Sequence, residues 1–153
     1  MKKFLQKKLK EQKGMTLIEL LAVIVIIAII AAIAIPAIGN IIDNSRVGAA
    51  KSDALNALSA ATLYLADNPN ETTVELSDLV TTSGNAYLDD AGTLDSFVYT
   101  VSSDTVIAVA TPTGITVNFG SGTTGVSKAA ISALPTNTSG AATGESAGIS
   151  VTR

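Results

Sequence analysis

The sequence predicts an α+β fold: a long N-terminal α-helix, membrane-spanning in its first half and amphipathic in its second, packs on a C-terminal antiparallel β-sheet. Three observations predict it. Residues 20–35 contain no polar side chain, residues 48–66 repeat apolar residues at the spacing of one helical face, and residues 97–119 hold three segments that alternate with period two. One face of such a sheet needs a cover, which the amphipathic half of the helix supplies.

Residues 1–14 form a basic leader. They hold six lysines against one glutamate, whereas the chain from Met15 onward carries twelve carboxylates against four basic side chains. Lysines that flank an apolar run stay on the cytoplasmic side of a membrane, so the acidic C-terminal part is expected to face outward. A phosphate backbone requires clustered Lys and Arg, so no direct nucleic-acid binding is predicted.

Residues 15–42 are predicted to form an apolar helix, interrupted only by Thr16, Glu19, Gly39 and Asn40. Such a helix is about 40 Å long, enough for a bilayer hydrocarbon core of about 30 Å. Pro36 removes one backbone N–H and clashes with the carbonyl of the preceding turn, and Gly39 weakens the same region. A kink or local unwinding is therefore expected at Pro36 and Gly39.

Two simple interpretations of this apolar segment stay open beside the more specific one given below. The segment could be a plain single-pass anchor, which leaves Glu19 and Pro36 without a role. It could also be a secretory signal, because Ala32-Ile33-Ala34 offers a small-residue cleavage site. Against the second interpretation, the apolar run exceeds the usual 7 to 15 residues or so and continues to Ile42.

Residues 43–68 are predicted to continue as an amphipathic helix. The residues expected on its buried face are Ala54, Leu55, Leu58, Ala61, Thr62 and Leu65. Asp67, Asn68 and Pro69 end this helix, because proline cannot continue it and the residue before a proline avoids the helical conformation.

Residues 69–153 are predicted to form a β-rich globular head. Thr72 and Glu75 fit a capping box for a short helix through about Leu79, and Ser83 to Asn85 read as a turn. The alternating strand residues are Phe97, Tyr99 and Val101; Val106, Ala108 and Ala110; and Ile115, Val117 and Phe119. These segments predict an antiparallel meander, followed from Gly120 by a Gly/Ser/Thr/Ala-rich tail whose ending GISVTR could add one more strand.

The chain has no cysteine and no histidine. Disulfides, Cys-based metal or redox sites, and Ser-His-Asp or Cys-His catalysis are therefore excluded. A carboxylate pair remains chemically possible among Asp89, Asp90, Asp95 and Asp104, but solvated turns explain these residues better. The order D-D-x-G-T also lacks the spacing of a calcium loop. No enzymatic activity, cofactor or metal is predicted.

The stretch KGMTLIEL, Lys13 to Leu20, resembles the processing motif of type IV prepilins: a basic leader, a glycine before the cut, Met or Phe after it, and then a T-L-I/V-E-L string. Pro36 stands at the position of the helix-breaking proline of mature pilins. The resemblance implies cleavage between Gly14 and Met15 by a prepilin peptidase, N-methylation of Met15, and a role for Glu19 in assembly. Glycine suits the cut because, without a Cβ, it lets the backbone extend.

The resemblance further implies a pilin-like fold and a structural subunit that forms a homo-oligomeric helical filament. The subunit would lie in membrane lipid as a single-pass protein with a cytoplasmic N-terminus, and then join an extracellular filament. Since the chain has no Walker motif, a separate assembly ATPase and platform proteins are expected as partners. The alternatives are a pseudopilin of a type II secretion or competence system and, more remotely, an anchored or secreted β domain with a binding function.

Overall fold

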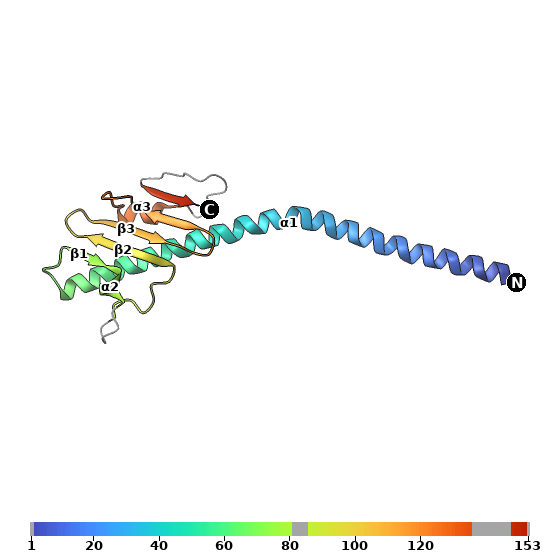
Figure 1. The fold of residues 1–153 in the computed structure, drawn as a ribbon, viewed down its shortest axis with the longest axis horizontal. Helices are drawn as coiled ribbons and strands as arrows, with labels where there is room; N and C mark the ends of the chain where they lie inside the picture. The colour runs from blue at the N-terminus through green and yellow to red at the C-terminus, as the bar shows by residue number, and fades with distance from the viewer. Residues whose placement is uncertain (1, 81–85, 136–147, 153) are drawn as a thin grey trace. The chain divides into compact units, whose positions relative to one another are not determined.

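The computed structural model describes residues 2–80, 86–135 and 148–152, with side chains described from Leu17 onward. In chain order the elements are α1 (Lys2–Asp67), β1 (Thr73–Glu75), α2 (Leu76–Leu79), β2 (Leu94–Thr100), β3 (Thr105–Ala110), β4 (Thr116–Phe119), α3 (Lys128–Ala133) and β5 (Ile149–Thr152) (Figure 1). The chain divides into two compact units, a helical unit (Met1–Ile41) and a head (Ile42–Arg153). The predicted α+β, pilin-like architecture is confirmed.

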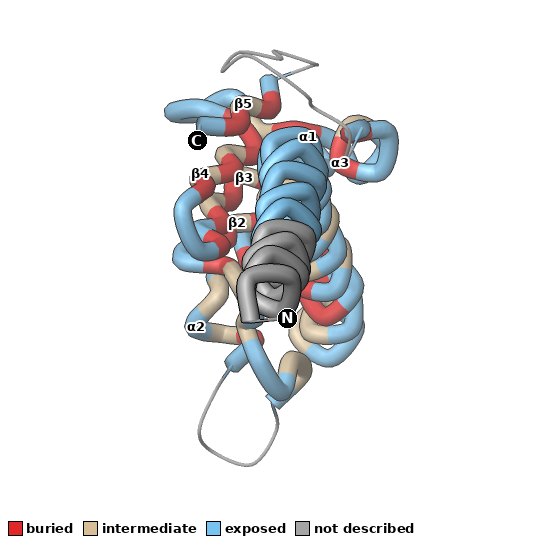
Figure 2. Tube along the Cα trace, turned by 90° about the vertical axis from the view of Figure 1, so that its right-hand side faces the viewer, coloured by how far each residue is buried: buried red, intermediate tan, exposed pale blue. Residues whose placement is uncertain are grey.

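The helical unit consists of the first part of α1. The helix continues without interruption through Pro36 and Gly39, so this turn is helical in the single chain. The predicted kink or unwinding at these two residues stays a prediction. Figure 2 colours the chain by burial, and every residue from Leu17 to Ile30 is exposed.

The head contains a five-stranded sheet in the order β1-β2-β3-β4-β5, with every neighbouring pair antiparallel. The predicted meander is therefore confirmed for β2 to β4. The ending GISVTR does add a strand, because Val151 pairs with Val117 and Ile149 with Phe119. The turn expected at residues 83–85 lies outside the described residues.

The capping box expected at Thr72 was misplaced. Residues 73–75 form β1 instead, with Val74 fully buried and paired with Tyr99 of β2. Pairing with β2 keeps this segment extended, so helix α2 begins only after Glu75. Glu75 is the N-cap and completes a capping box with Asp78.

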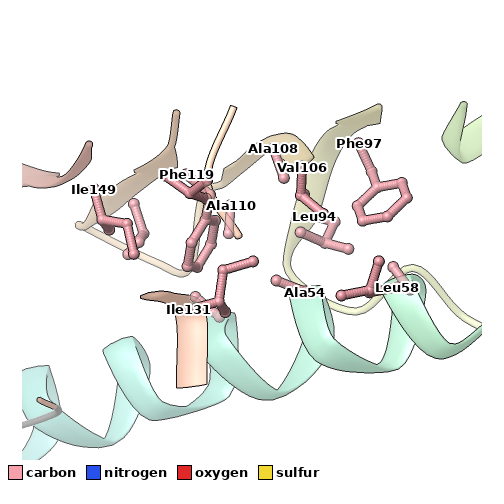
Figure 3. Close-up of a cluster of buried hydrophobic side chains, with 14 of the residues drawn as sticks. Ala54, Leu58, Leu94, Phe97, Val106, Ala108, Ala110, Phe119, Ile131 and Ile149 are labelled. Carbon is pink, nitrogen blue, oxygen red and sulfur yellow. The ribbon is translucent and has the colours of Figure 1, made fainter. Parts of the chain in front are cut away.

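The core lies between the sheet and the second part of α1 (Figure 3). Helix α1 contributes Val47, Ala50, Ala54, Ala57, Leu58, Ala60 and Ala61, all buried. The expected buried face was partly wrong: Thr62 is exposed and donates to the Ser59 carbonyl, while Leu55 and Leu65 are only half-buried. Alanines make up most of the buried face because small side chains let a helix approach a sheet closely, while Leu55 and Leu65 lie at its edges.

The strands contribute buried residues that alternation predicted, namely Phe97, Tyr99, Val106, Ala108, Ala110, Val117 and Phe119, and the predicted Ile115 is buried directly before β4. Val101 is the exception. It is 41% exposed because β2 ends at Thr100 and the chain turns through Asp104, whose φ is +51°. Helix α3 was not predicted. Ser127 caps its first turn, and it inserts Ile131 into the core.

Candidate functional site

The main candidate site is the surface of α1 in the helical unit. Every large aliphatic side chain from Leu17 to Ile41 is exposed, with exposed fractions between 48% for Val25 and 70% for Ile35. Fully burying one such side chain contributes roughly 1.5–3 kcal/mol, so this surface in water would forgo tens of kcal/mol. It therefore requires lipid or further copies of an apolar helix around it.

The length and composition of this helix fit a membrane. Within the described part of the chain, one helix is long and apolar enough to span a bilayer, beginning at Leu17 near the N-terminus. None of the residues in that window is buried, unlike those of the core helix of a soluble protein.

Glu19 is the one acidic or basic residue between Leu17 and Ile42, and its side chain is exposed. The backbone of Gly14 and Met15 is also helical, so Met15 lies one turn before Glu19, about 6 Å along the axis. A carboxylate at this place in an apolar surface is costly to transfer into a dry environment unless a counter-charge or hydrogen-bond donors accompany it. Any dry surface that covers Glu19 would therefore have to supply a hydrogen-bond donor or a positive charge there.

The carboxylates weighed for catalysis have local structural roles or face solvent. Asp104 accepts a hydrogen bond from the Tyr99 hydroxyl at 2.8 Å, and Asp90 accepts one from the Gly92 N–H at 3.0 Å. Asp89 and Asp95 are exposed. Among the described residues, no group of three or more acidic, histidine or cysteine side chains could hold a metal ion.

Two charged side chains of α1 in the head have roles that the sequence did not reveal. The Asp53 carboxylate accepts hydrogen bonds from the Thr93 N–H at 2.8 Å and from the Thr93 hydroxyl at 2.7 Å. The Lys51 ammonium donates to the carbonyls of Ser132 at 2.6 Å and Leu134 at 3.2 Å. The available signal was weak: both residues are charged positions beside buried alanines, which is equally typical of a solvated helix edge.

A tyrosine pair lies near the C-terminal end of α1. The rings of Tyr64 and Tyr87 meet edge to face with centroids 5.4 Å apart, and the Tyr87 hydroxyl donates to Asp67 at 2.7 Å. The pKa of Tyr87 is raised above its ordinary value, mainly by this hydrogen bond and secondly by desolvation. The hydrogen bond to Asp67 therefore favours the protonated phenol.

Comparison with known proteins places the N-terminal signal in a family. Residues 9–35 match the family model described as the prokaryotic N-terminal methylation motif, a range that includes Gly14, Met15 and Glu19. Neither the curated proteins nor the solved structures gave a match. The chain therefore carries the class III signal peptide of type IV pilins and pseudopilins, as its resemblance to prepilins predicted.

Proposed function

We propose that this chain is a structural subunit of a type IV pilus filament. The observation that carries the proposal is the combination of the methylation motif with an apolar helix surface that carries one carboxylate, Glu19. The apolar surface would lie in membrane lipid before assembly and against the same surface of other copies afterwards. The head, which carries most of the carboxylates, would cover the outside of the filament.

The proposed sequence begins with hydrolysis of the Gly14–Met15 peptide bond by a prepilin peptidase. This step removes residues 1–14 and leaves a free amine on Met15, which is then methylated. Since Gly14 and Met15 are helical in the uncleaved chain, cleavage requires local extension of the backbone there. Gly14 lowers the barrier to that extension, because glycine populates non-helical conformations readily.

The new Met15 amine is the proposed partner of Glu19 on an adjacent subunit. An α-amine has a pKa near 8, so it is cationic at neutral pH and can neutralise a carboxylate inside a packed apolar core. A subunit inserted in the wrong register would leave both charges unpaired, which costs several kcal/mol. The pair therefore acts as a register check, and the apolar surface provides the driving force.

Pro36 and Gly39 are proposed as the place where α1 loses helical order inside the filament. Residues 15–42 would be the filament-core helix, residues 43–68 the amphipathic helix and residues 69–153 the outer head. A prepilin peptidase, an assembly ATPase and platform proteins would be the partners. The final location would be the cell surface.

Substitution of Glu19 tests the proposal. Glu19→Ala is expected to yield cleaved, membrane-resident protein but few filaments, since the incoming subunit then lacks the carboxylate that pairs with the Met15 amine of a subunit already in the filament. Asn40→Ala, which removes another polar side chain from the apolar segment, should assemble normally. Filament yield by electron microscopy and cleavage by mass spectrometry are the measurements. Normal filaments from Glu19→Ala would contradict the proposed role.

A pseudopilin of a type II secretion or competence system is the second candidate, because the same signal peptide occurs in pseudopilins. A pseudopilus is short and ends within the cell envelope. Long surface filaments in micrographs of the native cell would favour the pilin. Their absence, together with cleaved and methylated subunit in the envelope, would favour the pseudopilin.

A further inference from the structure

The segment of residues 87–93, here named the strap, is fastened to α1 at both of its ends. At its first residue the Tyr87 hydroxyl donates to the Asp67 carboxylate at 2.7 Å. At its last residue the Thr93 N–H and hydroxyl donate to Asp53 at 2.8 and 2.7 Å. We call the two accepting carboxylates of α1, Asp53 and Asp67, the fasteners. The residues that donate to them, Tyr87 and Thr93, belong to the strap.

The two fasteners lie on one flank of α1, together with three residues between them. Asp53, Ala57, Ala60, Tyr64 and Asp67 follow one another at alternating intervals of four and three residues, which keeps them on one side of a helix. Ala57 is fully buried and Ala60 is 3% exposed. The Tyr87 ring packs on Tyr64 beside them.

The length of the strap shows that it has little slack. Asp53 and Asp67 are about 21 Å apart along the helix axis at 1.5 Å per residue. The six steps from Tyr87 to Thr93 reach at most about 20 to 22 Å when fully extended, and the long Tyr87 side chain adds the remaining reach. The strap therefore runs antiparallel to α1 along the flank that carries Ala57 and Ala60.

The end of the strap at Asp53 is fitted closely. Gly92 has a φ of +60°, and a Cβ on it would lie 2.5 Å from the Asp53 Oδ2. The Asp90 carboxylate accepts a hydrogen bond from the Gly92 N–H and shapes this turn. At the other end, the N–H groups of Tyr87 and Leu88 both donate to the Leu79 carbonyl, so the strap joins the end of α2 there.

We propose that the strap is a separately opening latch: release of its two carboxylate fasteners uncovers the Ala57–Ala60 flank of α1 while strands β2 to β4 stay folded. Backbone hydrogen bonds tie the ends of the strap to Leu79 and Thr111, but its attachments to α1 are the hydrogen bonds to the Asp53 and Asp67 side chains. Its Asp89 and Asp90 are exposed, and its Leu88 and Ala91 are only half-buried. Segments with few buried apolar contacts open at lower free energy than core strands, which here bury Phe97, Val106 and Phe119. The inference concerns the head alone and does not depend on filament formation.

Hydrogen exchange of the full chain in detergent micelles tests the latch. Asp53→Ala is expected to speed exchange of residues 86–93 by at least tenfold, with exchange in β3 and β4 unchanged. Asp95→Ala, which removes an exposed carboxylate from β2, should match the unmodified chain. Tyr87→Phe deletes only the phenol donor and should speed exchange selectively at the other end of the strap.

Two results would overturn the latch. The first is unchanged exchange of residues 86–93 in both Asp53→Ala and Tyr87→Phe, because the fasteners would then hold nothing. The second is equal acceleration of the strap, β3 and β4, or failure of Asp53→Ala to fold, because the strap and the sheet would then open as one unit.

Discussion

At the scale of single residues, a comparison of Gly92 with Gly122 distinguishes the cost of backbone strain from the cost of a side-chain clash. Both have a φ of +60°, but a Cβ would strike the Asp53 carboxylate at Gly92 and meet nothing within 4 Å at Gly122. We expect Gly92→Ala to lower the free energy of unfolding by about 1–3 kcal/mol, and Gly122→Ala to lower it by less. Denaturant titration of both variants measures the difference. Equal losses would show that Asp53 does not hold the strap closely.

Tyr99 gives the head a dependence on alkaline pH. Burial, and then the hydrogen bond to Asp104, raise the pKa of Tyr99 above the unfolded value of about 10. Because the folded-state pKa is the higher one, its contribution to stability is complete below about pH 10 and is lost as pH rises through the raised pKa. The midpoint temperature of thermal unfolding should therefore fall less steeply above about pH 10 for Tyr99→Phe than for the unmodified chain. Parallel curves would contradict this assignment.

At the scale of elements, Lys51 fixes the position of α3. Its ammonium bonds two carbonyls at the end of α3, where a cation is favoured, while the exposed Lys128 lies in the first turn of the same helix. We expect Lys51→Ala to lower the free energy of unfolding by about 1 kcal/mol and Lys128→Ala to change it little. Denaturant unfolding of the two variants checks this, and equal effects would contradict the role of Lys51 in positioning α3.

The elements that the sequence predicted from periodicity are those with several turns or several alternations. Helix α1 and strands β2 to β4 carry their own periodicity, so local patterns were sufficient. Strand β1 has three residues and α3 has six, too few for a period to show. Their conformations are decided by partners distant in the sequence: Val74 pairs with Tyr99, and Lys51 holds the end of α3.

At the scale of the whole molecule, the candidate assembly site was predictable because its signal is linear. Gly14, Met15, Glu19 and the apolar run lie within one short stretch, and a family model recognises that stretch. The strap was not predictable, since its fasteners join residues 20 and 40 positions apart. An exposed aspartate and one that accepts two hydrogen bonds from a distant threonine look identical in a sequence.

The helical unit and the head also differ in how much of their apolar surface they bury. The head buries its apolar residues within itself, whereas the helical unit leaves its isoleucines uncovered. A surface of this kind cannot remain in water, so the chain is incomplete without lipid or other copies. We propose that cleavage after Gly14 is the step that allows the helical unit to leave the lipid and pack against other copies.

Intact-mass analysis of the protein from its native membrane tests the central claim most directly. We predict a single species that lacks residues 1–14, begins at Met15 and carries one added methyl group. A chain that retains residues 1–14 would contradict processing at Gly14 and favour a plain membrane anchor. A product that begins at Ile35 would contradict the pilin assignment and indicate a secreted domain.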